Sequence, residues 1–302
     1  MISAVELAAD QRAAVRAMIE RRILERRLAA GMHPSLAARA AERIYANTTD
    51  DESARTQAWA LRDLMTDLGT AWTHARDRRA YLADLDVPVE HAHEALVAIM
   101  AELAGQELEL LALDLPAGDE VAAAAIASTQ AELQSTQMQL DLATPVENPL
   151  RVELRPMTET EFAAYRATAV EAYAQDLFDS GAFLDLESAL ESAATQTAHL
   201  LPAGRDSPGH HLWTAYDGHV PVGILWIFAG GDAAFIYDIE VRTDQRRLGY
   251  GREILDAGAL AAGRLGAEAV GLNVFGHNDG ARALYETAGY ATTEQSYRID
   301  LA

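Results

Sequence analysis

Hydrophobic residues in the first half of the chain recur at helical spacing. The longest stripe falls at i, i+3, i+4, i+7 and i+11, through Leu61, Leu64, Met65, Leu68 and Trp72. A second stripe is formed by Leu96, Ile99, Met100 and Leu103. Such stripes are typical of amphipathic helices that bury one face.

Helix-breaking residues separate these stripes. They lie at Gly31 with Pro34, at 47–51, at Pro88, and at Pro116 with Gly118. Between them the pattern predicts helices at roughly 3–30, 35–46, 51–84, 89–113 and 118–142, with Asp50 or Asp51 as the cap of the third. No strand pattern and no internal repeat is evident. Residues 1–145 therefore read as an all-α helical bundle domain of unknown role.

A different pattern begins after the proline-containing segment 144–149, which reads as a linker. Residues 150–302 mix alternating strand-like runs with helical ones, in the order β-α-α-β-β-β-α-β-α-β. The predicted helices cover about 158–175, 185–201, 249–265 and 278–288, and the first has a capping box of Thr158 and Glu161. The predicted strands are near 152–154 and at 211–216, 220–228, 233–241, 270–275 and 291–301. This half is an α/β (α+β) domain.

Composition limits the possible partners and chemistry. The 302 residues carry 46 acids against 24 bases, all of them arginine, for a net charge of −22. Such a chain repels nucleic acids and anionic membrane surfaces and attracts cationic molecules. Without lysine it cannot form a Schiff base, and without cysteine it has neither a thiolate nucleophile nor a thiolate metal site. The N-terminal residues do not resemble a signal peptide, so we expect a cytoplasmic protein.

The strongest local motif is Arg246-Arg247-Leu248-Gly249-Tyr250-Gly251-Arg252, between a predicted strand and a predicted helix. Backbone N–H groups at a helix N-terminus favour anions, and glycines let a phosphate approach them. The motif therefore predicts a phosphate or pyrophosphate site. It is not a dinucleotide-binding fingerprint, because Ile254 stands where that motif needs its third glycine.

This motif resembles the acetyl-CoA-binding motif of the GCN5-related N-acetyltransferase (GNAT) family. The resemblance continues in Asn278-x-x-Ala281-x-x-Leu284-Tyr285-Glu286-x-x-Gly289-Tyr290, and it covers about 151–302. It implies a mixed, mostly antiparallel sheet and transfer of an acetyl or short acyl group from CoA to an amine. Direct attack by the amine is the simplest route, because the chain has no cysteine for an acyl relay.

The resemblance also assigns the cofactor contacts. The main chain of Ile239 and Val241 would hold the pantetheine arm, and Asn278 would contact that arm. Apart from the resemblance, Arg246, Arg247 and Arg252 add positive charge beside the predicted phosphate site. The pyrophosphate would be bound by the amides of Arg247, Leu248, Gly249, Tyr250, Gly251 and Arg252.

Candidate acid and base residues lie close by. Asp238 and Glu240 are two apart on one strand, so they share a face and either could take the proton of a cationic amine; Glu240 is favoured. His210 and His211 are rivals, of which at most one faces the site. The resemblance makes Tyr285 the acid that protonates the leaving thiolate; a packed, purely structural tyrosine is the alternative. No metal is expected, because His91 and His93 do not face each other on a helix.

The leading hypothesis is therefore an N-acetyltransferase that uses acetyl-CoA and acts on a primary amine of a small molecule or peptide. The alternative is an acetyl-CoA-binding sensor that uses the helical half as a partner-binding effector. We also expect that the helical half could mediate homo-oligomer formation. The amine itself has no readable code in the sequence.

Overall fold

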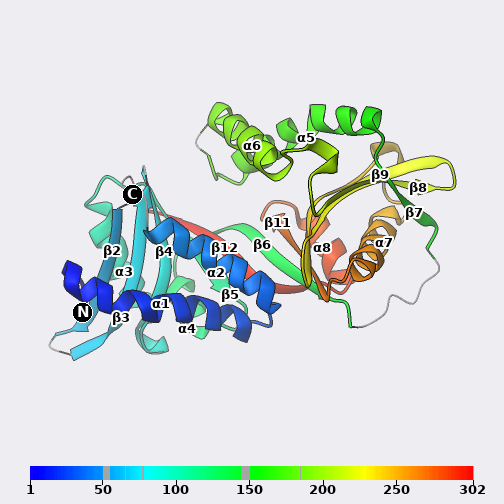
Figure 1. Cartoon of the computed structure of the whole chain (residues 1–302). Coiled ribbons are helices and arrows are strands. Elements are labelled where there is room, and N and C mark those ends of the chain that lie inside the picture. Colours follow the sequence, from blue (N-terminus) through cyan, green and yellow to red (C-terminus); the bar gives the residue numbers. More distant parts are fainter. Residues whose placement is uncertain (50–54, 65, 77, 144–149, 184, 302) are drawn as a thin grey trace. The chain divides into compact units, whose positions relative to one another are not determined.

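The computed structural model describes residues 1–49, 55–64, 66–76, 78–143, 150–183 and 185–301. They form two units, each built on a sheet with helices on its faces (Figure 1). Unit 1 comprises Met1–Gln134 and Thr293–Ala302, and unit 2 comprises Ser135–Thr292. The last strand of the chain thus belongs to the unit that contains the N-terminus.

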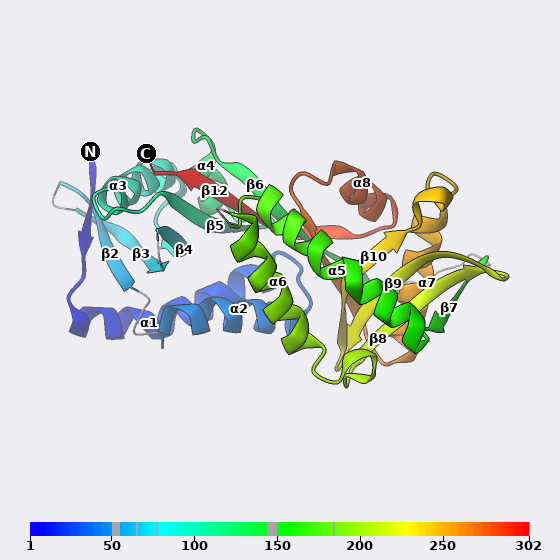
Figure 2. The same ribbon diagram turned by 90° about the horizontal axis from the view of Figure 1, so that it is seen from above.

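Unit 1 is an α/β unit. Its strands follow the order β1-β2-β3-β4-β5-β12, with β4 and β5 parallel and the other pairs antiparallel. Its elements are β1 (Ile2–Glu6), α1 (Ala9–Ala29), α2 (Pro34–Thr49), β2 (Arg55–Asp63), β3 (Thr66–Arg76), β4 (Arg79–Asp86), α3 (Ala92–Ala104), β5 (Leu110–Pro116), α4 (Glu120–Ile126) and β12 (Ala291–Asp300). Helices α1 and α2 pack on one face of the sheet and α3 on the other, as Figure 2 shows.

The prediction of an all-α helical bundle for 1–145 is therefore wrong. The stripe from Leu61 to Trp72 runs across a hairpin: Leu61 lies on β2, Leu64 in the turn with a φ of 53°, and Trp72 on β3. Because helices cover both faces of this sheet, its strands are buried on both sides and do not alternate. Their alanines also favour helix locally. The expected helical face for self-association disappears with the bundle.

Some helix ends in this half agree with the prediction. Helix α1 ends before Gly31 and α2 begins at Pro34. The predicted helices 89–113 and 118–142 each shorten and give way to a strand, β5 and β6 (Glu132–Asp141). The predicted linker at 144–149 and the cap at Asp50 or Asp51 lie outside the described residues.

The last strand predicted for 150–302 is β12 of unit 1, and the other elements predicted there lie in unit 2. They are β7 (Val152–Pro156), α5 (Glu159–Asp179), α6 (Leu186–Leu200), β8 (His210–Asp217), β9 (Val220–Ala229), β10 (Ala233–Val241), α7 (Tyr250–Arg264), β11 (Ala269–Phe275) and α8 (Asp279–Thr287). The capping box is confirmed, since Thr158 Oγ1 accepts the Glu161 N–H and the Glu161 side chain accepts the Thr158 N–H. No helix of the described chain is long and apolar enough to cross a membrane.

The sheet of unit 2 follows the order β6-β11-β10-β9-β8-β7. Strand β6 pairs antiparallel with β11, in register from Ala269↔Asp141 to Phe275↔Ser135. Strand β12 pairs antiparallel with β5 in unit 1, from Glu294↔Pro116 to Asp300↔Leu110. Each unit is thus completed by a strand that the element order would assign to the other.

The two halves also repeat one another, which the sequence did not reveal. Apart from 3₁₀ turns, both follow the order β-α-α-β-β-β-α-β-α-β, from β1 to β6 and from β7 to β12. The one parallel pairing recurs as well, between β4 and β5 and between β10 and β11. Unit 1 is therefore a second copy of the unit 2 fold.

Candidate active site

Strands β10 and β11 pair over only part of their length. Their parallel pairing covers Ala233–Ile236, whereas the pairing of β10 with β9 continues to Val241. The register shifts at Tyr237, which is a β-bulge between Ile236 and Asp238. Beyond the bulge, the parallel pairing with β11 has ended while β9 still pairs with the other edge of β10. Ile239 and Val241, the residues assigned to the pantetheine arm, lie in this part.

The loop before α7 is shaped to bind an anion. Arg247 has a φ of 65° and Gly249, the N-cap of α7, has a φ of 89°. Left-handed residues that alternate with ordinary ones turn consecutive N–H groups toward one side and form a concave anion site. The dipole of a 15-residue helix adds positive potential there. This geometry fits the predicted pyrophosphate site.

Gly251 has a packing role as well. A Cβ at this position would lie 2.9 Å from Leu284 Cδ2 on α8 and 3.6 Å from Val241 Cγ2 on β10. The glycine thus allows α7, α8 and β10 to approach closely. A larger side chain would disturb both the packing and the anion loop.

Two arginines of the motif are hydrogen-bonded to other parts of unit 2. Arg252 Nε donates to both carboxylate oxygens of Asp256 at 3.0 Å, and its Nη1 donates to the Thr287 carbonyl at 2.6 Å. It therefore ties α7 to α8. Arg246 Nε donates to the Val241 carbonyl at 3.1 Å. Arg151 was missed in the sequence: its Nη2 lies 3.4 Å from the Leu248 carbonyl, and its guanidinium pairs with Glu253 of α7 at 2.6 Å.

Asp238 and Glu240 have opposite environments. Burial raises the pKa of Asp238 to about 6, and its Oδ2 accepts a 2.8 Å hydrogen bond from the Tyr165 hydroxyl on α5. The Glu240 side chain is 61% exposed and lies 3.7 Å from Arg246 Nη2. A base should be partly ionised near neutral pH and held in position. Asp238 is therefore the hydrogen-bonded candidate with the raised pKa, and Glu240, the candidate favoured from the sequence, is the exposed one.

Tyr285 lies on α8 with only 7% of its surface exposed. Burial, with a contribution from the Asp238 charge, raises its pKa to about 12, so the phenol keeps its proton. Its hydroxyl has no hydrogen-bond partner among the described residues. Asn278 caps the same helix, since its Oδ1 accepts the Ala281 N–H at 3.1 Å.

The rival histidines are held by aromatic neighbours. Trp226 Nε1 donates to His210 Nδ1 at 3.0 Å, and His211 stacks on Trp213 with centroids 5.3 Å apart. In unit 1, His93 Nδ1 lies 3.1 Å from the Ala125 carbonyl. Among the described residues, no group of three or more His, Asp or Glu could hold a metal ion.

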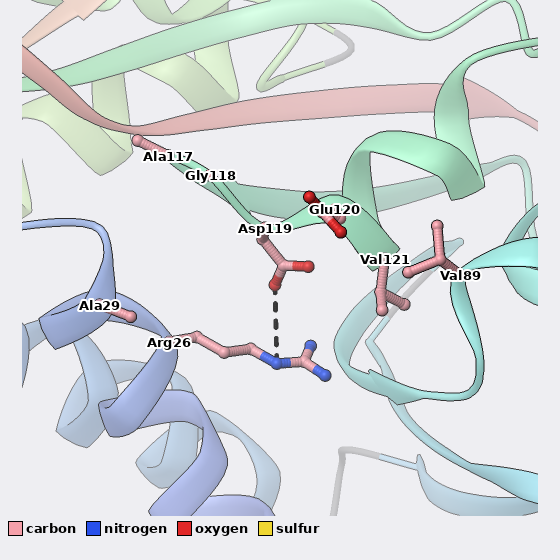
Figure 3. Close-up of a pocket in the computed structure, with 8 residues that line it drawn as sticks. All are labelled: Arg26, Ala29, Val89, Ala117, Gly118, Asp119, Glu120 and Val121. Atoms are coloured by element: carbon pink, nitrogen blue, oxygen red, sulfur yellow. Dashed lines mark ion pairs between the residues drawn. The ribbon is translucent and has the colours of Figure 1, made fainter.

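Unit 1 lacks the anion loop. The segment 87–91 between β4 and α3, which corresponds to that loop, contains neither glycine nor arginine. A pocket of about 400 Å³ lies beside it, where Arg26 Nε and Asp119 Oδ2 face each other at 3.6 Å (Figure 3). It is lined by Arg26, Ala29, Val89, Ala117, Gly118, Asp119, Glu120 and Val121. The candidate cofactor site is therefore in unit 2.

Comparison with known proteins agrees with this placement. The family model described as "Acetyltransferase (GNAT) family" matches residues 170–290. The chain is 35% identical to the uncharacterized N-acetyltransferase YycN of Bacillus subtilis over 150 residues, which are 48% of this chain and 96% of the relative. It is equally similar to YdgE of the same organism, with 35% identity over 153 residues, 49% of this chain and 97% of that relative.

A solved structure extends the similarity in fold to the whole chain. The GCN5-related N-acetyltransferase from Sphaerobacter thermophilus aligns with a TM-score of 0.55, and it covers 99% of this chain and 96% of its own. The sequence identity is 17%, so this likeness concerns the fold alone. It agrees with a two-unit α/β architecture and not with a helical bundle.

Proposed function

The chain belongs to the GNAT acetyltransferase family and is an acetyltransferase, and we propose that unit 2 transfers the acetyl group directly from CoA to a primary amine. The observation that carries this proposal is the group formed by Asp238, its partner Tyr165 and Tyr285, next to the point where β10 parts from β11. A buried carboxylate and a protonated phenol are the pair of groups that such a transfer needs.

The cofactor contacts are proposed as the resemblance implies. Amides from Arg247 to Arg252 bind the pyrophosphate, with charge from Arg246, and the main chain of Ile239 and Val241 holds the pantetheine arm. The left-handed conformations at Arg247 and Gly249 support this assignment, because they direct the loop amides outward. Asn278 Oδ1 accepts the Ala281 N–H as a helix cap, which leaves its Nδ2 group to donate to the cofactor arm.

In the proposed reaction Asp238 first takes a proton from the ammonium group, directly or through water. The free amine then attacks the thioester carbon, and the C–S bond breaks as the amide forms. Tyr285 gives its proton to the leaving thiolate, whose pKa of about 8.5 by analogy with cysteine makes it a good acceptor. Asp238 then releases the proton that it took to solvent, and the remaining proton on nitrogen returns through water to the Tyr285 phenolate. The balance is one amide, one CoA thiol and one released proton.

The test is to incubate the protein with acetyl-CoA and a panel of primary amines. A thiol reagent measures the CoA that the reaction releases. The chain has no cysteine, so the reagent detects the product alone. We expect amine-dependent release with wild-type protein and little with Asp238→Asn. If acetyl-CoA binds and no amine in the panel is acetylated, the proposed transfer to a primary amine is contradicted.

A further inference from the structure

Helices α1 and α5 correspond residue for residue. Each has 21 residues, and a glycine with positive φ follows its end. In each, the side chain of the third helical residue accepts the backbone N–H of the N-cap residue. The matched pairs are Ala8 with Thr158, Gln11 with Glu161, and Gly31 with Gly181. Arg22 of α1 therefore corresponds to Ala172 of α5, and Arg26 corresponds to Asp176.

Strands β4 and β10 share the same irregularity. In β4 the register shifts between Thr73↔Leu82 and Trp72↔Asp84, which places a bulge just before Asp84. In β10 the bulge lies just before Asp238. Asp84 therefore corresponds to Asp238, and Asp86 to Glu240.

In unit 1 the aspartate after the bulge, Asp84, pairs with two arginine side chains. Arg22 Nη2 lies 2.5 Å from Asp84 Oδ2, and Arg26 Nη1 lies 3.6 Å from Asp84 Oδ1. Arg22 Nη1 also pairs with Asp86 at 2.8 Å. The Asp84 side chain is fully buried, and a buried carboxylate of this kind needs such partners. Unit 1 thus fills this position with its own guanidinium groups.

In unit 2 the same position has carboxylates without those arginines. Tyr165, Ala172 and Asp176 follow one another at i, i+7 and i+11, so they share the face of α5 that turns toward Asp238. Among the described residues, Asp176 lies 3.4 Å from His277 Nε2, and no arginine pairs with it. The charges of Glu240 and Asp176 both raise the pKa of Asp238. The four corresponding positions hold two arginines and two acids in unit 1, and one alanine and three acids in unit 2.

We infer that the acceptor carries a second cationic group besides the amine that is acetylated, and that its two charges take the place that Arg22 and Arg26 have in unit 1. This inference rests on the proposed function for the site. Asp238 receives the reacting amine, and Asp176 binds the second cation. A diamine, a polyamine or a peptide with two basic groups fits this description.

The experiment measures amine binding, so that it does not depend on turnover. Calorimetry on the full chain saturated with CoA compares 1,4-diaminobutane with 1-aminobutane, which has one charge fewer. Each partly buried ion pair contributes enough for about a tenfold change in affinity. We expect the diamine to bind at least about tenfold more tightly, and Asp176→Asn to lose that preference. Glu171→Gln, on another face of α5, is the matched control and should keep it.

A second variant restores the unit 1 arrangement. Ala172→Arg copies Arg22 at an exposed position of the helix, and arginine is a good helix former. The new guanidinium should occupy the site and weaken diamine binding at least about tenfold. Ala167→Arg places the same charge on the opposite face of α5 and should bind the diamine like wild type.

The outcomes separate the two proposals. Equal affinities for the diamine and the monoamine, or wild-type diamine binding by Ala172→Arg, overturn the inference of a dicationic acceptor. Selective diamine binding without any acetyl transfer supports the inference about the acceptor and refutes the proposed reaction. Equal binding with acetylation of both amines refutes only the inference about the second charge.

Discussion

The Tyr165 hydroxyl donates a 2.8 Å hydrogen bond to Asp238 Oδ2 and so ties helix α5 to the strand residue that follows the bulge. Burial raises the pKa of this carboxyl to about 6, while the hydrogen bond from Tyr165 opposes that rise. The pair therefore sets the pH range in which Asp238 can accept a proton. It also couples the position of α5 to the ionisation of the site.

Asp238→Asn should make the protein more stable and nearly inactive. The folded-state pKa lies above the ordinary carboxyl value of 3.8, so the fold loses stability as the pH rises from about 4 to 6. Above that window, the free energy of unfolding of the variant should exceed that of the wild type by on the order of 1–3 kcal/mol. Urea denaturation at pH 4.5 and 7.5 measures this, with a larger gain expected at 7.5. A variant that is equally or less stable at both pH values contradicts the assignment.

Wild-type activity should follow the same group. The value of kcat/KM should increase as the pH rises through about 6, because only the ionised Asp238 accepts the amine's proton. Removing the Tyr165 hydrogen bond in Tyr165→Phe should move this limb to higher pH. A pH–rate profile with the limb unmoved would show that Tyr165 does not act through Asp238.

Tyr285→Phe should lower kcat by roughly 10²-fold or more and leave the affinity for acetyl-CoA nearly unchanged. The hydroxyl has no hydrogen-bond partner among the residues that the structure describes, so its removal costs no internal contact. Steady-state kinetics with calorimetry of acetyl-CoA binding measures both quantities. A folded variant that acetylates amines at the wild-type rate excludes Tyr285 as the acid.

Two arginines of the motif, Arg247 and Arg252, should respond differently to removal of their charge. Arg247→Gln should weaken CoA binding several-fold, with a loss that shrinks at high salt, as expected for exposed charges near a pyrophosphate. Arg252→Gln should mainly reduce stability, since Arg252 bonds Asp256 and the Thr287 carbonyl. Binding isotherms at two salt concentrations, with melting curves, compare the two variants. The opposite pattern would move the pyrophosphate contact to Arg252.

Glu294→Ala should strongly destabilise unit 1. Glu294 on β12 pairs at 2.5 Å with Arg27, which is only 4% exposed, and Asp114 lies 3.2 Å from the same nitrogen. Burial raises the pKa of Glu294 to about 8, and Asp114 stays beside Arg27 in the variant, so the expected loss is that of a buried hydrogen-bond partner, on the order of 1–3 kcal/mol. Glu132→Ala is the matched control, because its pair with Arg298 is largely exposed and should contribute less than about 1 kcal/mol. Equal urea midpoints for the two variants would rule out this role for Glu294.

The sequence was most informative where local chemistry decides the structure. The loop before α7, the caps at Thr158 and Asn278, and the elements of unit 2 could all be read from turn residues and periodicity. The pairing of Tyr165 with Asp238 could not, because it joins residues 73 positions apart on a helix and a strand. A tyrosine within a helix gives no signal of the strand that it will contact.

The failure in unit 1 has a physical cause. Strand β3 has Ala71, Trp72 and Thr73 buried in succession because helices cover both faces of the sheet. Continuous burial removes the alternation by which a strand is recognised, and alanine favours a helix when tertiary contacts are ignored. The repeat was hidden for a related reason. Corresponding positions such as Arg22 and Ala172 carry different residues on the same backbone.

The exchange of β6 and β12 determines when the protein can complete its fold during synthesis. Unit 1 gains β12, which places Glu294 beside the buried Arg27, only after the ribosome has translated all of unit 2. Domains that emerge first usually fold first, but this one must wait for the strand that follows α8. We therefore expect the two units to fold as a single cooperative event after translation, and a nascent chain stopped before β12 to remain a target for chaperones and proteases.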